Sequence, residues 1–332
     1  MRGLIRTLLL FSVASAFFAC VEAPWPSGPS GGSATNLNVV LITLDGVRWQ
    51  EFFERERHFQ SFWKDLAPLG TTYGDPGQSS SARVSNTVNV SLPAYQSMFA
   101  GQATGCLTNS CPRVVQETVL DRLSTELGFS QEQIAVFSSW DAIQGAVTSL
   151  DSSAVVNSGI VPFAGISGDP EIEQINRDLQ IDLPPWAIIP NKDDDNPPGG
   201  ARWDKYTVAL AKRYLVLKRP RFLYLSFDDS DEWGHLQNYP KYLDAIHAHD
   251  RWILEIRQLL DGMGEYGRNT LLIITTDHGR GSWDQWGWHG PLWPASDKIW
   301  FYLQTPSNGQ FTAIRPNARE IQHLDLRPTI ET

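Results

Sequence analysis

The chain has 332 residues, of which 42% are hydrophobic and only 19% charged, so it can bury a large core and is not disordered as a whole. Its net charge of -10 excludes a dominant basic surface of the kind that binds a phosphate backbone, and we expect no nucleic-acid polymer as a partner. Only three cysteines occur, at positions 20, 106 and 111, which excludes a fold held together mainly by disulfides.

Residues 1–20 have the pattern of an export signal. Two arginines precede an apolar stretch, residues 7–18, that is too short to span a bilayer. Two processing routes are open: cleavage after the small-residue triplet 14–16, or lipidation of Cys20, which ends an imperfect bacterial lipobox. Residues 21–37 are rich in Pro, Gly and Ser and have the composition of a flexible linker. We therefore expect an exported protein, periplasmic or at the cell surface, with a membrane tether if Cys20 is lipidated.

Export bears on the other two cysteines. Cys106 and Cys111 lie in one short loop, and in an oxidising compartment we expect them to form a disulfide. The alternative is two free thiols or a soft metal site, but no second cysteine pair or nearby histidine completes a zinc site.

Beyond the linker, apolar runs and helical stretches alternate along the chain. Five runs lack polar alternation and predict parallel strands covered on both faces: residues 39–44, 134–137, 222–227, 271–276 and 299–303. Three helical stretches are bounded by Gly or Pro: residues 115–127, 203–217 and 240–260. Residues 147–200 carry several prolines and an acidic run, so we expect a loop-rich insertion there. The alternation predicts one α/β domain over residues 38–332.

Acidic residues follow three of the predicted strands. Asp45 follows the first, Asp228, Asp229 and Asp231 the third, and Asp277 the fourth. Ligand sites in parallel sheets lie outside the carboxyl ends of the strands, where these carboxylates would repel one another unless cations lay between them. We expect Asp231 to be a ligand, and Asp228 and Asp229 to be loop acids or to support a ligand; the alternative is that one of them replaces Asp231 as the ligand. Imidazoles occur near these acids, at His235, His278 and His289. Imidazole with carboxylate favours zinc or a similar metal over calcium or magnesium.

Five short motifs occur in a fixed order: LITLDG at 41–46, VSLPAY at 90–95, DEWGH at 231–235, TDHG at 276–279 and WHG at 288–290. In this order they resemble the alkaline phosphatase superfamily, and most closely its nucleotide pyrophosphatase and phosphodiesterase branch. The resemblance covers residue 38 to the C-terminus. It implies a three-layer α/β/α sandwich with a mainly parallel central sheet.

The resemblance also implies a two-metal site. Two divalent ions, of the zinc class, would be held by two sets of residues. Asp45, Ser91, Asp277 and His278 would surround one ion, and Asp231, His235 and His289 would hold the other. The reaction it implies is in-line attack by Ser91 on phosphorus, a phosphoserine intermediate, and hydrolysis of that intermediate by water at the second metal.

The residues around Ser91 agree with this role. Ser91 followed by Pro93 can cap a helix, and the N-terminus of a helix attracts an anion such as a phosphoryl group. Seen alone, such a serine is more often only a helix cap. Because Ser91 lies within one of the five ordered motifs, we favour the role of nucleophile over that of a helix cap.

Phosphate-ester hydrolysis fits this chain better than two other reactions of the superfamily. A sulfatase needs an arginine where this sequence has Tyr95, and a phosphomutase needs a cap domain larger than residues 147–200. We expect a small-molecule phosphodiester as substrate. The alternatives are a phosphomonoesterase, a sulfatase, or a metal-binding or ligand-binding module that has lost catalysis. A monoesterase needs a cation for the extra phosphate charge, and the candidates are Arg48, Arg83 and Lys205.

Tryptophans gather in the sequence around His289, at positions 283, 286, 288 and 293. They could form an aromatic rim that grips a base, sugar or lipid part of a substrate, although packing explains most tryptophans. Four other histidines, at positions 58, 247, 249 and 323, we assign to packing.

Overall fold

The computed structural model describes residues 37–54, 57–77, 81–86, 88–150, 153–187, 200–307 and 320–331. The predicted export signal with Cys20, and all but the last residue of the predicted linker, lie outside the described residues. Among the described residues, no helix is both long enough and apolar enough to cross a membrane.

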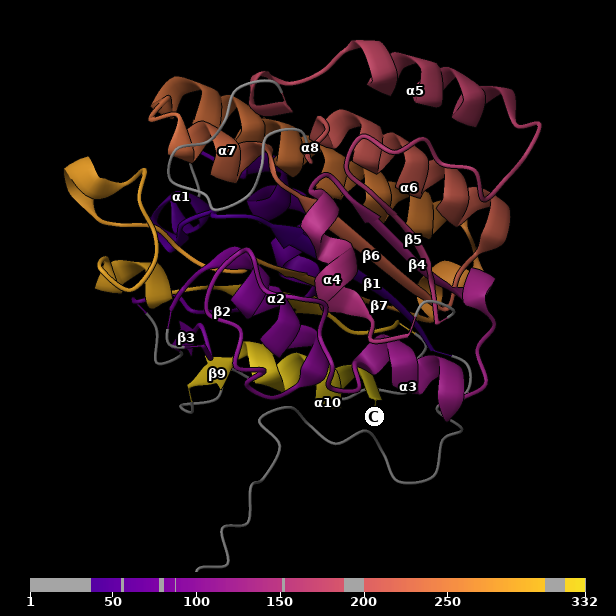
Figure 1. Cartoon of the computed structure of the whole chain (residues 1–332), viewed down its shortest axis with the longest axis horizontal. Helices are drawn as coiled ribbons and strands as arrows, with labels where there is room; N and C mark the ends of the chain where they lie inside the picture. Colours follow the sequence, from indigo (N-terminus) through magenta and orange to yellow (C-terminus); the bar gives the residue numbers. More distant parts are fainter. Residues whose placement is uncertain are drawn as a thin grey trace, which may run out of the picture.

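A twisted sheet forms the centre of the domain (Figure 1). It has seven strands, in the order β2-β8-β7-β1-β6-β4-β5. Its strands are β1 (Asn38–Leu44), β2 (Thr71–Tyr73), β4 (Ile134–Ser138), β5 (Val155–Ser158), β6 (Phe222–Phe227), β7 (Thr270–Thr275) and β8 (Phe301–Gln304). The five strands from β7 to β5 run parallel to one another, which confirms the mainly parallel sheet. A separate pair, β3 (Ala82–Arg83) and β9 (Ile321–Gln322), is also parallel.

The prediction that the last apolar run is a parallel strand is wrong. β8 pairs antiparallel with β7, and β2 pairs antiparallel with β8. A parallel neighbour needs a crossover connection, usually through a helix that returns the chain to the same end of the sheet. Between β7 and β8 the described chain forms only two short 3-10 turns, η7 (Trp283–Gln285) and η8 (Pro294–Asp297), so the chain comes back in the opposite direction.

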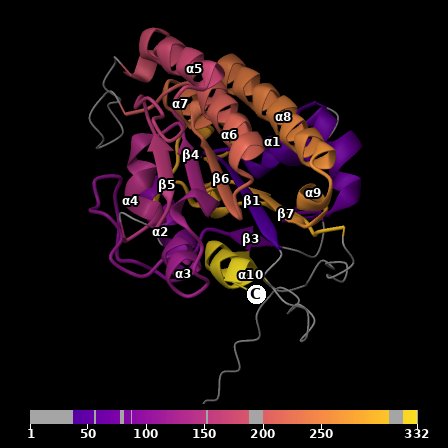
Figure 2. The ribbon, with the colours of Figure 1, turned by 90° about the vertical axis from the view of Figure 1, so that its right-hand side faces the viewer.

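Both faces of the sheet are covered, which explains why the strands lack polar alternation. In β1, Val39 and Leu41 belong to one apolar cluster, and Val40, Ile42 and Leu44 belong to the other. The first cluster includes residues of α2 (Ser91–Ala100), α3 (Val119–Thr125), α4 (Gln144–Val147) and α10 (Leu326–Glu331). The second includes residues of α1 (Trp49–Phe53), the π-helix η2 (Phe62–Leu66), α5 (Pro170–Ile181), α6 (Asp204–Lys218) and α8 (Tyr239–Gly262). Figure 2 shows the helices on the two sides of the strands, and the predicted three-layer sandwich is confirmed.

The three predicted helical stretches correspond to α3, α6 and α8. α3 begins later than predicted because Thr118 caps it: the Thr118 hydroxyl accepts from the N–H of Asp121, and the Asp121 carboxylate accepts from the N–H of Thr118. In α8, Pro240 lies in the first turn, where its missing N–H costs nothing.

Part of the segment 147–200, which we expected to be loop-rich, forms a strand and a helix. β5 adds to the edge of the sheet as a parallel partner of β4. α5 begins at Pro170, after the carboxylate of Asp169 accepts from the N–H of Ile172, and it packs against α6. Residues 188–199, which include the acidic run, lie outside the described residues.

Candidate active site

The carboxyl ends of β1, β6 and β7 bring three aspartates together. Asp45 follows β1, and its N–H donates to the carbonyl of Phe227, at the end of β6, over 3.0 Å. Asp231 lies on α7 (Asp229–His235), which follows β6 directly. Asp277 follows β7 and accepts a 3.1 Å hydrogen bond from the N–H of Gly46. All three carboxylates are buried, so this edge of the sheet concentrates negative charge.

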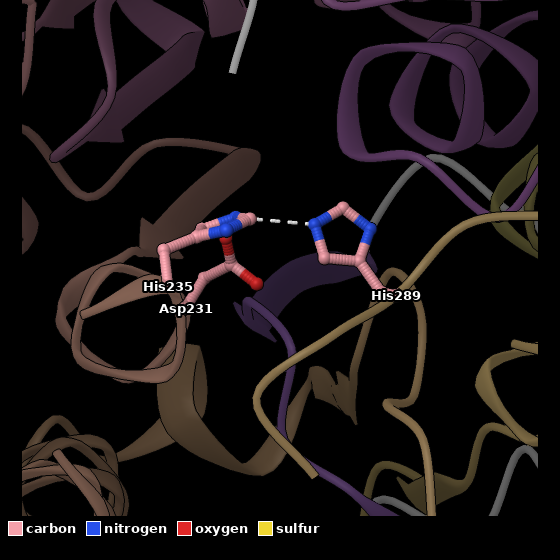
Figure 3. Close-up of side chains that lie close together, drawn as sticks. All are labelled: Asp231, His235 and His289. Atoms are coloured by element: carbon pink, nitrogen blue, oxygen red, sulfur yellow. Dashed lines mark hydrogen bonds and ion pairs between the residues drawn. The ribbon is translucent and has the colours of Figure 1, made fainter. Parts of the chain in front are cut away.

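Asp231, His235 and His289 form the first cluster of metal-ligating side chains (Figure 3). Asp231 and His235 are one turn apart on α7, and His235 Nε2 lies 2.8 Å from Asp231 Oδ2. His289 comes from the loop between β7 and β8, and its Nε2 lies 3.1 Å from His235 Nε2. Two imidazole nitrogens and one carboxylate oxygen are a donor set that suits zinc.

His289 is held in a metal-binding tautomer. Its Nδ1–H donates to the carbonyl of Asn89 over 3.0 Å, which leaves the lone pair on Nε2, facing His235. Burial and the neighbouring His278 hold the pKa of His289 well below its usual value, so the ring is neutral. The pKa of His235 is raised although burial opposes this, because Asp231 stabilises its charged form.

The second cluster contains Asp45, Asp231 and His278. His278 Nε2 lies 3.5 Å from Asp45 Oδ1, 3.8 Å from Asp231 Oδ1 and 3.4 Å from Asp277 Oδ2. It also lies 3.1 Å from Ser91 Oγ. Asp231 belongs to both clusters and so joins them, whereas the sequence analysis gave it to one ion only.

The second cluster has the electrostatic character of a cation site. His278 Nδ1–H donates to the carbonyl of Gly279 over 2.9 Å, so in a neutral ring the Nε2 lone pair faces carboxylate oxygens. Within the described part of the chain, Asp45 Oδ1 and Asp277 Oδ2 are buried and accept no hydrogen bond. Burial, together with the charges of Asp277 and Asp231, raises the pKa of Asp45 well above its usual range. A metal ion among these atoms would bind the unpaired carboxylate oxygens and the Nε2 lone pair and would offset the negative charge. The residues of this cluster therefore fit a metal ion.

Arg280 is a site residue that the sequence analysis missed. Its buried guanidinium pairs with Asp231 Oδ1 and donates to the carbonyls of Asp231 (2.7 Å) and Gly287 (2.5 Å). Burial opposes the effect, but Arg280 and His235 hold the pKa of Asp231 well below its usual range. Gly46 and Gly234 make room for this cation, since a Cβ at either position would collide with the guanidinium. The position of Arg280 directly after the TDHG motif does not by itself indicate this role, because it depends on contacts with segments that are distant in the sequence.

Ser91 is the first residue of α2 and not its cap, which corrects the expectation from the sequence. Val90 occupies the cap position with an extended backbone and makes no capping bond through its side chain. The N–H of Leu92 donates to Oδ1 of Asn109 over 3.0 Å, and Pro93 has no N–H. The helix terminus therefore offers an anion fewer donors than a free first turn would. Asn109 itself reaches this terminus, which the sequence did not reveal.

A cavity of about 260 Å³ opens beside His235 and His289. Leu107, Thr108 and Asn109 line one part of it, and Trp288 and Trp293 line another. The Leu107 loop is closed by the predicted Cys106–Cys111 disulfide, which is confirmed. Of the expected aromatic rim, Trp283 and Trp286 line a different groove, together with Arg48.

The three candidate phosphate-binding cations are all paired elsewhere. Arg48 binds Glu51 and the carbonyl of Gly281. Arg83 binds Asp297 and Glu320, and Lys205 binds Asp182. Among the described residues, the lining of the cavity includes no lysine or arginine.

The backbone of Asp228 and Asp229, and the side chains of His249 and His323, take part in structural hydrogen bonds, whereas Asp228 Oδ2 is buried and has no hydrogen-bond partner among the described residues. The N–H groups of Asp228 and Asp229 donate to the buried carboxylate of Asp204, which also lies 2.7 Å from Nε2 of His249. This network lies at the start of α7 and supports the helix that carries Asp231. His323 is buried and donates to the carbonyl of Thr276 over 3.0 Å.

The comparisons with known proteins agree with this architecture. The family model "Type I phosphodiesterase / nucleotide pyrophosphatase" matches residues 39–328. Three solved structures illustrate the likeness in fold. A 2-O GAG sulfatase is 14% identical, with a TM-score of 0.56 over 89% of this chain and 70% of that one. The alkaline phosphatase PafA is 13% identical, with a TM-score of 0.52 over 75% and 64%. The phosphonate monoester hydrolase of Agrobacterium radiobacter is 14% identical, with a TM-score of 0.52 over 89% and 73%.

No curated protein matches the sequence. The solved structures are too distant in sequence to carry more than the fold, but the family model spans most of the chain. The chain belongs to the type I phosphodiesterase/nucleotide pyrophosphatase family, within the alkaline phosphatase superfamily of ester hydrolases.

Proposed function

We propose that this protein is an exported, metal-dependent phosphodiesterase that uses Ser91 as its nucleophile. The observation that carries the proposal is the position of the Ser91 hydroxyl, 3.1 Å from Nε2 of His278, beside two clusters that share Asp231. A serine that only began a helix would not need its oxygen next to an imidazole that belongs to a cluster of metal-ligating side chains.

We assign two divalent ions of the zinc class to the two clusters. Asp231, His235 and His289 would hold one, and Asp45, Asp277 and His278, with Ser91, the other. When bound, such ions stabilise the charge on phosphoryl oxygens and lower the pKa of the attacking hydroxyl or water. Ser91 attacks phosphorus in line, the first alcohol leaves, and water hydrolyses the phosphoserine to release the monoester.

A diester is favoured over a monoester by the surroundings of the cavity. A phosphate monoester carries an additional negative charge, and a site for it gains from a lysine or arginine that binds the extra oxygen. Arg48, Arg83 and Lys205 are each bound to carboxylates, and no lysine or arginine lines the described cavity.

Export is supported by the N-terminal sequence and by the Cys106–Cys111 disulfide, because disulfides persist mainly in oxidising compartments. Cell fractionation of Cys20→Ser against the unchanged protein tests the tether. Lipidation predicts a shift from the membrane fraction to the soluble fraction. A protein that is soluble before the substitution would instead support cleavage after residue 16.

The proposed reaction is tested with two serines of the same helix. Ser91 and Ser97 are both buried in α2, and the Ser97 hydroxyl donates to the carbonyl of Pro93. We expect Ser91→Ala to lose turnover of bis-(4-nitrophenyl) phosphate while about two zinc-class ions per chain remain. Ser97→Ala should keep most of the activity. Substantial activity in Ser91→Ala, with no phosphoserine trapped in the unchanged protein, would mean that water attacks the ester directly.

A further inference from the structure

The loop between β7 and β8 contributes tryptophans to two separate places on the molecule. Trp288 lines the cavity beside the proposed metal ligands, whereas Trp283 and Trp286 line a groove of about 600 Å³. Among the described residues, the cavity and the groove have no lining residue in common. The proposed reaction at the metal ligands therefore does not account for the groove.

Trp283 presents its ring to solvent in the groove. Its side chain is 90% exposed, the largest exposed fraction of any large hydrophobic residue in the described chain. Its backbone has a φ of 56°, in the left-handed region that a bulky residue rarely adopts. Both the exposed indole and the strained backbone cost free energy, and backbone strain is concentrated at sites that bind ligands. These two observations indicate that Trp283 contacts a ligand.

The walls of the groove are held in place by contacts within the protein. The carbonyl of Gly281 accepts a 3.1 Å hydrogen bond from Nη1 of Arg48, which ties the tryptophan loop to the segment that follows β1. The ring of Trp286 packs against Tyr239 and Tyr242, with centroids 4.9 and 5.4 Å apart. A preformed, largely apolar surface with a few polar groups is typical of small-molecule sites.

The charges of the groove are balanced. Arg48 and Glu51 line it and form an ion pair with each other. Glu54 also lines it, and its carboxylate lies 3.8 Å from Nη1 of Arg57. A cationic ligand would in addition be repelled by Lys298, whose ammonium already lies over an indole ring of the groove, 5.8 Å from the ring centroid. The groove therefore favours an uncharged ligand.

Hydrogen-bonding groups lie beside the aromatic rings. The amide of Gln50, the hydroxyl of Ser282 and the carboxylate of Glu54 all line the groove. A sugar ring matches this combination, because it presents C–H groups on its faces and hydroxyls, which both donate and accept, around its edge. An indole offers a wide, rigid surface to such a face at a low cost in conformational entropy. The groove is more than twice as large as the cavity of about 260 Å³, which leaves room for more than one ring.

We infer that this groove binds a neutral saccharide, with one sugar ring stacked on Trp283. The inference goes beyond the proposed function and does not depend on it, because the groove is lined by other residues than the cavity at His235 and His289. A saccharide in the groove would hold the protein on a glycan and leave the proposed active site open.

Calorimetric titration of the metal-loaded protein with cellohexaose, maltohexaose and chitohexaose tests the inference. We expect at least one of these neutral hexasaccharides to bind with a Kd of about 1 mM or lower. Trp283→Ala should weaken this binding about tenfold or more, because the stacking surface is lost, and Trp283→Phe should restore part of it. Glu54→Gln should have little effect, because the amide still forms hydrogen bonds and no charge on the ligand needs a partner.

Trp293→Ala is the matched control, because Trp293 lines the cavity beside His289 and not the groove. It should leave saccharide binding unchanged. Trp283→Ala should in turn leave kcat/KM for bis-(4-nitrophenyl) phosphate unchanged.

Absence of binding by all three hexasaccharides, or an equal loss of binding in the Trp283 and Trp293 variants, would overturn the inference. Binding of choline or adenosine at Trp283 in place of the saccharides would also overturn it, since the groove would then be a site for an organic cation or an aromatic ring. Saccharide binding through Trp283 in a protein without Ser91-dependent hydrolysis would confirm the groove and contradict only the proposed function.

Discussion

The hydroxyl of Tyr95 donates a hydrogen bond of 3.0 Å to Oδ2 of Asp45. Both side chains are buried, and the second oxygen of the carboxylate, Oδ1, lies 3.5 Å from Nε2 of His278. The bond therefore turns one oxygen of Asp45 toward the helix that begins at Ser91 and the other toward the second cluster. Tyr95 occupies the position where a sulfatase has an arginine. In this chain the residue at that position instead orients Asp45, a proposed metal ligand.

Tyr95→Phe should weaken metal binding or turnover about ten- to a hundredfold, because partners that orient ligands have effects of this size. Metal titration of the apoprotein measures the effect on metal binding, and kcat/KM on bis-(4-nitrophenyl) phosphate measures the effect on turnover. Tyr224→Phe is the matched control, since the buried Tyr224 hydroxyl bonds to Thr43 and not to a carboxylate. If both variants behave alike, Tyr95 acts only through packing.

Arg280→Met should lower the free energy of unfolding by about 3 kcal/mol or more in the presence of a chelator, because Asp231 would remain buried without its cation. The loss should be smaller in the metal-loaded protein, where an ion can replace the guanidinium. Chemical denaturation with and without metal measures both values.

Arg202→Met is the control for Arg280. Arg202 is equally buried, but its guanidinium donates to the neutral side chains of Thr207 and Asn157. The cost of Arg202→Met should not depend on metal. A metal-independent cost for Arg280→Met would contradict the assignment of Asp231 as a ligand.

The sequence predicted the strands and the acidic ends of the strands well, because a run buried on both faces must be apolar throughout. β1 illustrates this: its alternate residues enter two different cores. β5 was missed because Val155-Val156-Asn157-Ser158 is short and only half apolar, and its place at the sheet edge depends on pairing with β4. The direction of β8 was missed because an apolar run has no direction.

Arg280 could not have been predicted from local pattern, because an arginine after a loop motif is usually exposed. It is buried only because two distant segments bring Gly46 and Gly234 against it and Asp231 supplies its counter-charge. The joining of the two clusters through Asp231 was missed for a similar reason. Sequence order shows which residues are close along the chain, but not which carboxylate lies between two groups of ligands.

Stability at low pH should depend on Asp121. Burial opposes the shift, but hydrogen bonds from Thr148, Ser149 and Thr118 lower the pKa of Asp121 to about 2. The lowered pKa contributes about 2 kcal/mol above pH 4, and this contribution is lost as the pH falls from 4 through 2. Asp121→Asn should destabilise the protein at pH 7 and flatten this part of the pH profile, measured by denaturation. An unchanged profile would show that other carboxylates dominate.

The measurement that tests the central claim most directly is a comparison of kcat/KM for bis-(4-nitrophenyl) phosphate, 4-nitrophenyl phosphate and 4-nitrophenyl sulfate on the metal-loaded protein. We predict that the diester is preferred over the monoester about ten- to a hundredfold, because the extra phosphate oxygen lacks a charge-assisted hydrogen bond worth about 1.5 to 3 kcal/mol. Sulfate turnover should be the lowest of the three. A clear preference for the monoester, or sulfate turnover above both phosphates, would contradict the assignment as a phosphodiesterase.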